Sequence, residues 1–266
     1  MPRILLTVSY DGTAYSGWQR QINGESIQAC LEDALSRATG ETIRVTGASR
    51  TDAGVHALGQ KCHFDTLSRI PADKFPFVLQ PLLPPDIRVT QGMAVADGFH
   101  ARFLSCRKKY TYRFLNCRFP DAMHRLYHLH VPRKLQDTEM TRALADLLGT
   151  HDFAAFQAAG GTAKSTVRTI YRADLTRDGD CLTLFLEGNA FLYNMVRIIA
   201  GTLVEIGEGR RSPEAFREAL ETGSRLALGP TAPPHGLELT DVLYPPDAYL
   251  HPEFHRWHEE AEESLK

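Results

Sequence analysis

Apolar and polar positions along the first third of the chain predict short strands separated by helices. Residues 3–10 (RILLTVSY) form a predicted strand that ends at an Asp-Gly turn. Residues 26–40 place apolar side chains at helical spacing, with Ser26 as N-cap and Gly40 just past the end. Three more strands and a short helix stopped by prolines complete a βαββαβ order, with the strands at 42–48, 60–66 and 86–95 and the helix at 72–83.

A similar order begins again at about residue 108. We expect a hairpin of 166–177 and 181–188 about Asp178-Gly179, and a long helix over 190–205. A shorter helix follows at 212–223, with Ser212 as cap and Pro213 at its first position. Strands at 109–116, 126–132 and 239–245 and a helix at 137–149 complete the pattern.

The doubled pattern predicts an α+β fold of two similar halves with antiparallel or mixed sheets. We place the N-terminal half at 1–105, the C-terminal half at 106–250 and an acidic tail at 251–266. The halves share a pattern but no matching residues. Because no low-complexity linker separates them, we expect them to pack closely around an active-site cleft.

Composition narrows the function classes. The chain has 266 residues, of which 43% are hydrophobic and 23% charged, as is usual for a soluble protein. No apolar run reaches the roughly 18 residues of a membrane span, and the start turns polar too soon for a signal peptide, so we expect a cytoplasmic protein that does not contact membranes.

The five cysteines are scattered and form no CxxC pair, which argues against a disulfide framework or a zinc site. His128 and His130 share a strand face, but without a third ligand in sight a half-buried strand is the favoured interpretation.

Charge is unevenly distributed although the net charge is only -2. Residues 99–118 contain six arginines or lysines, no acid, and the interleaved aromatic residues Phe103, Tyr110, Tyr112 and Phe114. Aromatic rings stack on bases while cations neutralise phosphates, so the segment is a candidate nucleic-acid surface. A solvated strand face is the alternative.

The segment 47–60 (GASRTDAGVHALGQ) is rich in glycine and poor in residues to bury. Arg50 and Asp52 are two residues apart, so their side chains point to the same side of an extended backbone. An aspartate beside a cation stays ionised and can act as a nucleophile, a base or an electrostatic stabiliser. The alternative is a surface ion pair on a turn. His56 is either a base or, with more support, a histidine that bonds its own turn.

The predicted helix within 189–207 (NAFLYNMVRIIAGTLVEIG) is apolar almost all round, which is typical of a buried helix. Arg197 lies in its middle, on the face of Asn194 and Gly201. A buried guanidinium needs an anionic partner, and we expect a buried carboxylate. An arginine whose stem reaches solvent is the alternative. Neither a serine nucleophile elbow nor a phosphate-binding P-loop has its required glycines here.

Five segments together resemble the tRNA pseudouridine synthase A family, over about residues 4–244. They are YDGTAYSGWQRQ, RTDAGVHALGQ, FHARFLSCRKKYTY, TVRTIY and NAFLYNMVRIIAGTLVEIG, in that order. The resemblance implies a cofactor-free isomerase, binding no metal, that converts uridine 38, 39 or 40 in the anticodon arm of tRNA to pseudouridine. It also implies a homodimer with basic clefts.

Residue roles follow from the same resemblance. Asp52 corresponds to the catalytic aspartate, and Arg50 to an arginine that helps to displace the target base. Tyr110 corresponds to the aromatic residue that stacks on the uracil, Arg197 to the arginine that pairs with the aspartate, and Leu237 to an apolar residue that closes the pocket. We expect phosphate contacts from Arg107, Lys108, Lys109, Lys164 and Arg168.

This sequence departs from the family pattern at two positions, and two other functions remain open. Ser49 stands where many members have glycine, and Glu238 where an aromatic residue is frequent. A non-catalytic RNA-binding protein built from doubled α+β modules would need the basic and aromatic residues but neither Asp52 nor Arg197. A hydrolase with Asp52 as base would release the base instead of rejoining it.

Overall fold

The computed structural model describes residues 1–22 and 24–249, so the predicted acidic tail at 251–266 lies outside the described residues. The chain divides into two compact units. The first comprises Met1–Cys106 and the segment that begins at Leu239, and the second comprises Arg107–Glu238. Each unit contains its own strands and its own helices.

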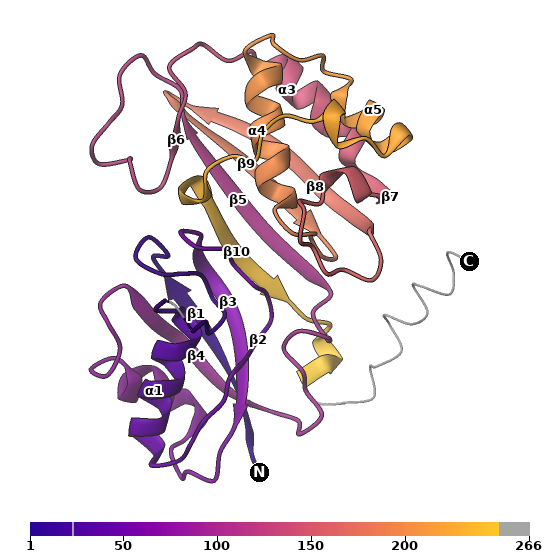
Figure 1. Cartoon of the computed structure of the whole chain (residues 1–266). Coiled ribbons are helices and arrows are strands. Elements are labelled where there is room, and N and C mark those ends of the chain that lie inside the picture. Colours follow the sequence, from indigo (N-terminus) through magenta and orange to yellow (C-terminus); the bar gives the residue numbers. More distant parts are fainter. Residues whose placement is uncertain (23, 250–266) are drawn as a thin grey trace. The chain divides into compact units, whose positions relative to one another are not determined.

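In the first unit, β1 (Arg3–Tyr10) lies between two antiparallel neighbours, β3 (His56–Asp65) and β4 (Ile87–Val95) (Figure 1). The short β2 (Thr46–Gly47) pairs with the other edge of β3. Leu6 is fully buried and pairs with Cys62 on one side and Gly92 on the other. The predicted βαββαβ order is therefore confirmed, with η1 (Ala72–Lys74) and α2 (Phe75–Leu79) as its second helical element.

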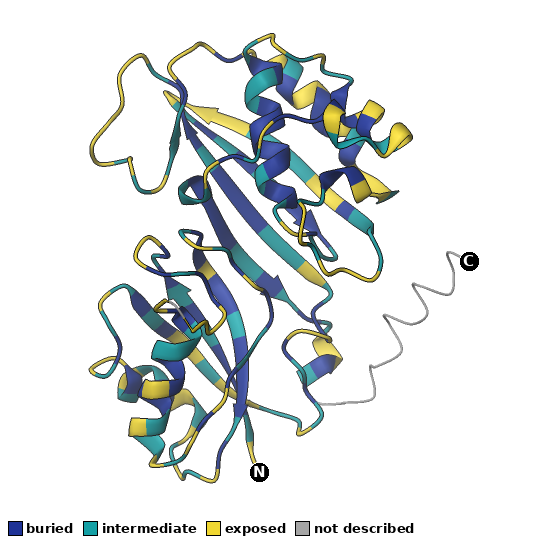
Figure 2. Cartoon of the chain, viewed as in Figure 1, coloured by how far each residue is buried: buried dark blue, intermediate teal, exposed yellow. Residues whose placement is uncertain are grey.

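Helix α1 (Ile27–Thr39) begins and ends where its sequence predicts. The Ser26 hydroxyl accepts the N–H of Ala29 at 3.3 Å, which satisfies one of the free donors of the first turn. Gly40 has φ +76° and closes the last turn by donating to the Ser36 carbonyl. The apolar stripe of α1 is buried (Figure 2), and burial of that face stabilises the helix more than its intrinsic propensity does.

In the second unit, four antiparallel strands follow in the order β5, β9, β8, β7. They are β5 (Arg107–Leu115), β9 (Cys181–Gly188), β8 (Val167–Asp178) and β7 (Gly149–Asp152), and β6 (Leu129–His130) runs parallel to the end of β5. The hairpin of β8 and β9 turns at Gly179, whose φ of +57° suits glycine, as predicted. Helices α3 (Asp137–Leu144), α4 (Met195–Gly207) and α5 (Ala215–Thr222) gather over one face of these strands (Figure 1).

Short 3-10 turns connect these elements. They are η2 (Ala145–Leu147), η3 (Ala154–Phe156), η4 (Arg225–Ala227) and η5 (Pro234–Gly236) in the second unit, and η6 (Pro246–Tyr249) in the first. The last strand, β10 (Leu237–Leu243), begins in the second unit and continues into the first. The fold is α+β with a mixed sheet, and the described residues contribute ten strands to it.

Four predicted boundaries are wrong in detail. The strands predicted at 42–48 and 126–132 shrink to β2 and β6. Helix α4 starts at Met195 instead of residue 190, because Asn194 takes a left-handed conformation (φ +61°) that no helix continues through. Helix α5 starts at Ala215, one turn after Ser212, although the Ser212 hydroxyl accepts the N–H of Glu214. Among the described residues, no helix combines the length and the apolar character that crossing a membrane requires.

Candidate active site

The Asp52 segment is held by a second glycine-rich segment of the first unit, residues 10–18. The N–H of Trp18 donates to the Thr51 carbonyl at 3.0 Å, and the N–H of Gly54 donates to the Tyr15 carbonyl at 3.3 Å. The hydroxyls of Tyr10 and Thr51 lie 2.7 Å apart in a buried hydrogen bond. Backbone and side-chain bonds thus fix the residues on both sides of Asp52.

Two glycines allow these segments to approach so closely. A Cβ on Gly12 would lie 2.0 Å from the Val55 carbonyl oxygen, and one on Gly17 would lie 2.5 Å from the Thr51 carbonyl oxygen. Gly17 also has φ +95°, which side chains rarely adopt. These contacts explain why the Y-D-G and S-G-W triplets accompany the R-T-D triplet in this sequence.

Asp52 is half-exposed at a tight turn, where its carbonyl accepts the N–H of Val55 at 3.1 Å. Just before it, Gln60 brackets Ser49: the amide nitrogen of Gln60 donates to the Ser49 carbonyl at 2.7 Å, and its oxygen accepts the Ser49 N–H at 3.2 Å. Arg50 is exposed, and within the described part of the chain it forms no ion pair with Asp52. The alternative of a surface ion pair between Arg50 and Asp52 is therefore not found in the part of the chain that the structure describes.

His56 links the two segments. It is buried, and its Nδ1 accepts the N–H of Gly12 at 3.1 Å. The same Nδ1 lies 3.1 Å from a carboxylate oxygen of Asp11, which also belongs to the glycine-rich segment. The bond to Gly12 supports a structural role for His56.

In the second unit, Arg197 is fixed from two directions. Its Nε donates to the Ala232 carbonyl at 2.7 Å, and the N–H of Ala232 donates back to the Arg197 carbonyl at 3.0 Å. Its Nη1 donates to the side-chain oxygen of Asn194 at 2.9 Å. Asn194 is the one non-glycine residue with positive φ in the described ranges. Such strain is kept where the surrounding structure demands it, and here it places an acceptor beside the guanidinium.

The loop 228–236 lies along α4 and carries the contacts that hold Arg197. Gly201 allows the approach, since a Cβ there would lie 1.9 Å from the Pro230 carbonyl oxygen. The Tyr112 hydroxyl donates to the Pro233 carbonyl at 2.8 Å. Burial raises the pKa of Tyr112, while the nearby Arg197 cation acts in the opposite direction. Leu237 follows this loop and is buried. Sequence reasoning missed the loop, although its LGPTAPPHG composition marks a rigid, extended connection.

Tyr110 occupies the middle of β5, opposite Leu186 of β9. Its side chain is 7% exposed and meets the Phe191 ring edge-on at a centroid distance of 5.0 Å. Phe191 lies in the segment that leads into α4. The second unit therefore places Tyr110 and Arg197 beside the connection between β9 and α4.

The predicted phosphate-binding residues gather at one end of the strands of the second unit. Lys108 of β5 pairs with Gly188 of β9, and Gly188 also pairs with Ile170 of β8. The start of β5 is therefore separated by one strand from the start of β8, where Arg168 lies. Lys164 is exposed in the loop before β8. Arg107 differs from the others, because its Nη1 lies 2.8 Å from Glu187 and its guanidinium stacks 4.6 Å from the Tyr171 ring centre.

Glu238, one of the departures from the family pattern, has a partner of its own. Its carboxylate lies 2.9 Å from Nη1 of Arg113, and both side chains are largely buried. At the position where the family pattern often has an aromatic residue, this chain therefore has a carboxylate that pairs with Arg113.

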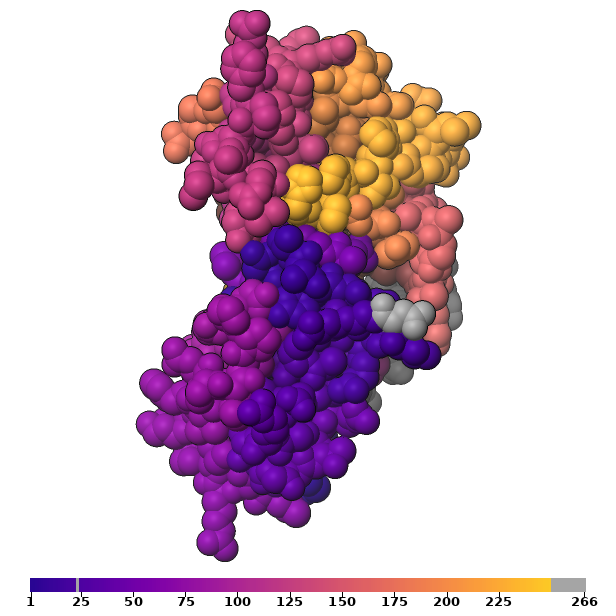
Figure 3. Space-filling model, turned by 60° about the vertical axis from the view of Figure 1, so that its left-hand side comes forward, coloured from indigo at the N-terminus to yellow at the C-terminus, as the bar shows by residue number. Residues whose placement is uncertain are grey.

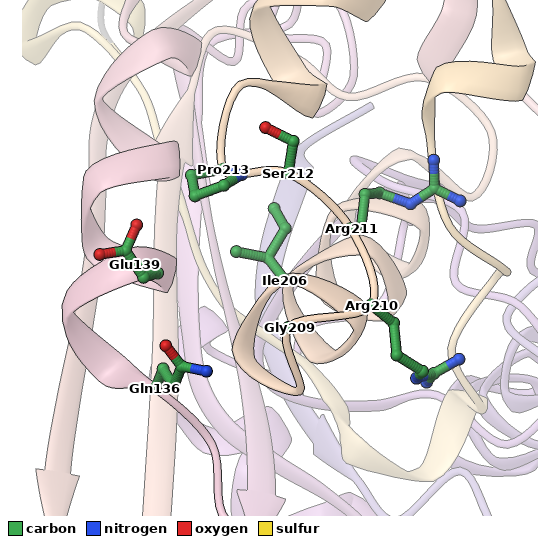
Figure 4. A pocket seen from close by; sticks show the side chains of 8 residues that line it. All are labelled: Gln136, Glu139, Ile206, Gly209, Arg210, Arg211, Ser212 and Pro213. Carbon is green, nitrogen blue, oxygen red and sulfur yellow. The ribbon is translucent and has the colours of Figure 1, made fainter.

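One surface pocket of the second unit lies apart from these residues (Figure 4). It lies between α3 and the end of α4, and its two arginines are neutralised by glutamates of α4 and the following turn: Arg211 pairs with Glu205 at 2.8 Å, and Arg210 pairs with Glu208. None of the sequence-predicted site residues lines it. A cluster of His124, His128 and Cys181 is the candidate metal site of the described residues.

Comparison with known proteins identifies the family. A family model described as tRNA pseudouridine synthase matches residues 6–103 and 143–245, which defines the class of the protein. tRNA pseudouridine synthase A of Thermoanaerobacter sp. (strain X514) is 44% identical over 244 residues, covering 92% of this chain and 100% of that protein. The Bacillus subtilis (strain 168) protein of that name is 45% identical over 244 residues, covering 91% and 99%. The chain belongs to the tRNA pseudouridine synthase A family.

Solved structures add little. The crystal structure of the archaeal box H/ACA sRNP Nop10-Cbf5 complex is 10% identical, with a TM-score of 0.34, and the match covers 85% of this chain and 60% of that chain. A likeness this weak carries no argument about the site.

Proposed function

We propose that this protein converts uridine to pseudouridine at positions 38, 39 and 40 of the tRNA anticodon arm, with Asp52 as the catalytic carboxylate. Isomerase activity follows from membership of the family. The observation that supports Asp52 is the precision of its surroundings: Thr51, Gly54 and Val55 are all held by backbone bonds, while Asp52 itself stays half-exposed. A carboxylate held this way is preorganised for reaction with a bound nucleotide.

The reaction needs no chemical group carrier besides this carboxylate. The N1–C1′ bond of the target uridine breaks, the uracil turns, a new bond forms between C5 and C1′, the hydrogen on C5 leaves as a proton, and N1 takes up a proton. The atoms balance without an external carrier of electrons, phosphoryl groups or acyl groups. Asp52 acts as an ionised carboxylate on the sugar, on the uracil ring or on a proton that must leave.

We propose Arg197 as the cation that keeps Asp52 ionised. Two contacts of Arg197 within its own unit position the guanidinium, and both go to neutral acceptors: the Ala232 carbonyl and the Asn194 side chain. A guanidinium positioned by neutral acceptors is suited to stabilise an anion supplied from elsewhere.

The target base must leave its stack before Asp52 can reach it, at a cost of a few kcal/mol. We propose that Tyr110 offers a ring for the displaced uracil, that Arg50 helps to displace the base, and that Leu237 closes the pocket. Phosphate contacts from Lys108, Lys109, Lys164 and Arg168 offset the cost. Arg107 contributes less, because Glu187 already neutralises it. We further propose that the enzyme works as a homodimer in the cytoplasm.

Nucleoside analysis of an unmodified tRNA transcript incubated with the protein tests this function. Pseudouridine should form at positions 38 to 40, detected by mass-sensitive chromatography after derivatisation that is specific for pseudouridine, with no release of free uracil. Released uracil would instead identify a hydrolase. Tight tRNA binding with neither product would identify a non-catalytic RNA-binding protein.

A further inference from the structure

We propose that His124, His128 and Cys181 form a binding site for one zinc ion in the second unit. Each residue offers one ligand atom, and these atoms all lie within 4.8 Å of one another. The three residues come from two distant parts of the sequence: the loop 117–128 supplies both histidines, and the first residue of β9 supplies the cysteine. No activity assigned above uses any of them.

The backbone places the two histidines on one side of a turn. The N–H groups of Tyr127 and His128 both donate to the His124 carbonyl at 3.0 Å, so the residues four apart share a face. An H-x3-H spacing is a common zinc-ligand pattern. The loop leaves β5 and returns as β6, and it stands out from the strands on the surface of the second unit (Figures 1 and 3). Cys181 lies opposite Leu115, at the end of β5 where the loop begins.

The surroundings of the two imidazoles leave a ring nitrogen available on each. Nδ1 of His124 lies 2.8 Å from the Asp121 carboxylate, and a carboxylate on one ring nitrogen leaves the other free to bind a metal. Nδ1 of His128 is buried and has no hydrogen-bond partner among the residues that the structure describes.

The donor set selects the metal. Two imidazole nitrogens and one thiolate suit zinc, with ligand distances of about 2.1 Å to nitrogen and 2.3 Å to sulfur. Tetrahedral ligands at those distances lie about 3.6 Å apart, so the cluster must contract by about 1 Å, which rotation of the side chains of an exposed loop allows. Water or the nearby thiol of Cys117 completes the coordination; that thiol now donates to the Phe119 carbonyl.

Charges around the cluster favour a cation. Arg113 lies near His128, and Glu238 pairs with it at 2.9 Å. Asp121 adds negative charge, Arg125 in the loop donates to the Ala122 carbonyl, and the thiol of Cys181 would release its proton on binding zinc.

His130 does not belong to the site, because its Nε2 bonds the Cys117 carbonyl at 2.9 Å. The sequence pattern favours a half-buried strand over a metal site at His128 and His130, and the proposed cluster indeed does not include His130. Its other two ligand residues are His124, in the same loop, and Cys181, far along the chain.

Cobalt substitution tests the site without using activity. The full chain, stripped of metal by a chelator, is titrated with Co²⁺ and then with Zn²⁺ under reducing conditions. We expect one equivalent of Co²⁺ to give visible absorption of a tetrahedral centre and a near-ultraviolet band from thiolate to metal, and Zn²⁺ to remove both. Cys181→Ser should abolish the thiolate band, and His124→Gln and His128→Gln should each weaken binding by about 10-fold or more.

Matched variants elsewhere in the chain serve as controls. Cys30→Ser and His151→Gln should bind as the unaltered chain does, since neither residue belongs to the cluster. Circular dichroism confirms that each variant is folded. The site is refuted if the stripped protein takes up no Co²⁺ at micromolar concentrations, or if Cys181→Ser keeps the thiolate band. Because pseudouridine formation is measured separately, failure of the metal site leaves the proposed function intact.

Discussion

At the residue scale, His63 sets part of the response of the first unit to acid. Its Nδ1 accepts the N–H of Ala101 at 3.1 Å, and its ring packs edge-on against His100 and Phe99. Burial lowers its pKa to about 4, with smaller contributions from the Arg3 cation and from His100. A protonated ring would lose the Ala101 bond, which explains why the neutral form is preferred.

Acid should therefore destabilise the protein through His63. Above pH of about 6.5 the residue is neutral in both states and contributes nothing. As pH falls from there towards about 4, the unfolded chain binds a proton that the folded chain does not, so the free energy of unfolding decreases by up to about 3 kcal/mol and then levels off. His63→Asn, whose side-chain oxygen can accept the Ala101 N–H, should lose less stability over that interval in urea titrations. Equal losses in His63→Asn and the unaltered chain would contradict this role; His151→Gln is the control.

Arg197 is the residue through which the proposed chemistry is most easily perturbed. Arg197→Met keeps much of the apolar stem but removes the charge and both anchoring bonds. We expect turnover near neutral pH to fall by at least about 100-fold, with part of it restored at higher pH, where an unsupported carboxylate ionises. The pH dependence of kcat tests this.

A double-mutant cycle tests the same pair through stability. In urea titrations, the free energy of unfolding of the double variant Arg197→Met with Asp52→Asn should exceed the value expected from adding the two single effects, by about 1 kcal/mol or more. Additive effects and an unshifted pH profile would show that the two residues do not interact.

At the element scale, the packing of α4 against the loop 228–236 decides where Arg197 lies. Gly201 meets the Pro230 carbonyl, Gly229 donates its N–H to the Thr202 hydroxyl at 2.9 Å, and Ala232 exchanges two bonds with Arg197. These contacts leave no room for a larger residue on this face of the helix. The buried face of α4 is continuous from Val196 to Leu203, with only Arg197 half-exposed.

Gly201→Ala should therefore be far more disruptive than its size suggests. The added methyl group would sit 1.9 Å from a backbone oxygen, so the loop must move and take the Ala232 carbonyl with it. We expect a loss of about 2–3 kcal/mol in the free energy of unfolding, together with reduced turnover. Gly179→Asn is the control: its φ of +57° suits asparagine and nothing lies within 4 Å, so it should cost less than about 1 kcal/mol. Equal effects of the two substitutions in urea titrations would contradict the close packing.

The sequence predicted those helices and turns whose ends are set by neighbouring residues, such as caps and turn glycines. Ser26 and Gly40 define α1, and the turn at Gly179 defines the β8–β9 hairpin. The start of α4 could not be predicted, because the left-handed Asn194 is imposed by contacts with Arg197. Two other features could not be predicted because they depend on contacts between segments far apart in the sequence. They are the contacts of the loop 228–236 and the proximity of Cys181 to two histidines. For the candidate site, the sequence proposed the residues, and the bonds that hold them became visible only in the structure.

At the scale of the whole molecule, RNA binding should depend on cations collected from separate strands. Lys108 and Lys109 begin β5, and the register brings Arg168 of β8 towards them. We expect tRNA affinity to fall steeply with salt, and the double variant Lys108→Ala with Lys109→Ala to flatten the slope of log affinity against log salt by about 1 to 2. Arg107→Ala should change it less, because Glu187 already pairs with that cation.

Filter binding over a range of salt concentrations measures these slopes. The charge-matched control is Arg37→Ala with Lys74→Ala, which removes two exposed cations of the first unit that lie beside acids of their own. If the control flattens the slope as much as the β5 variant does, the RNA surface does not follow the start of β5.

The most direct test of the whole account is the turnover of Asp52→Asn. The substitution removes a charge and leaves the surrounding backbone bonds in place, so the variant should fold and bind tRNA with an affinity changed by no more than about tenfold. It should form no pseudouridine at positions 38 to 40, even with enzyme in excess over tRNA. Asp73→Asn, at an exposed aspartate of η1, should react as the unaltered enzyme does. Pseudouridine formed by a pure preparation of Asp52→Asn would contradict the central claim.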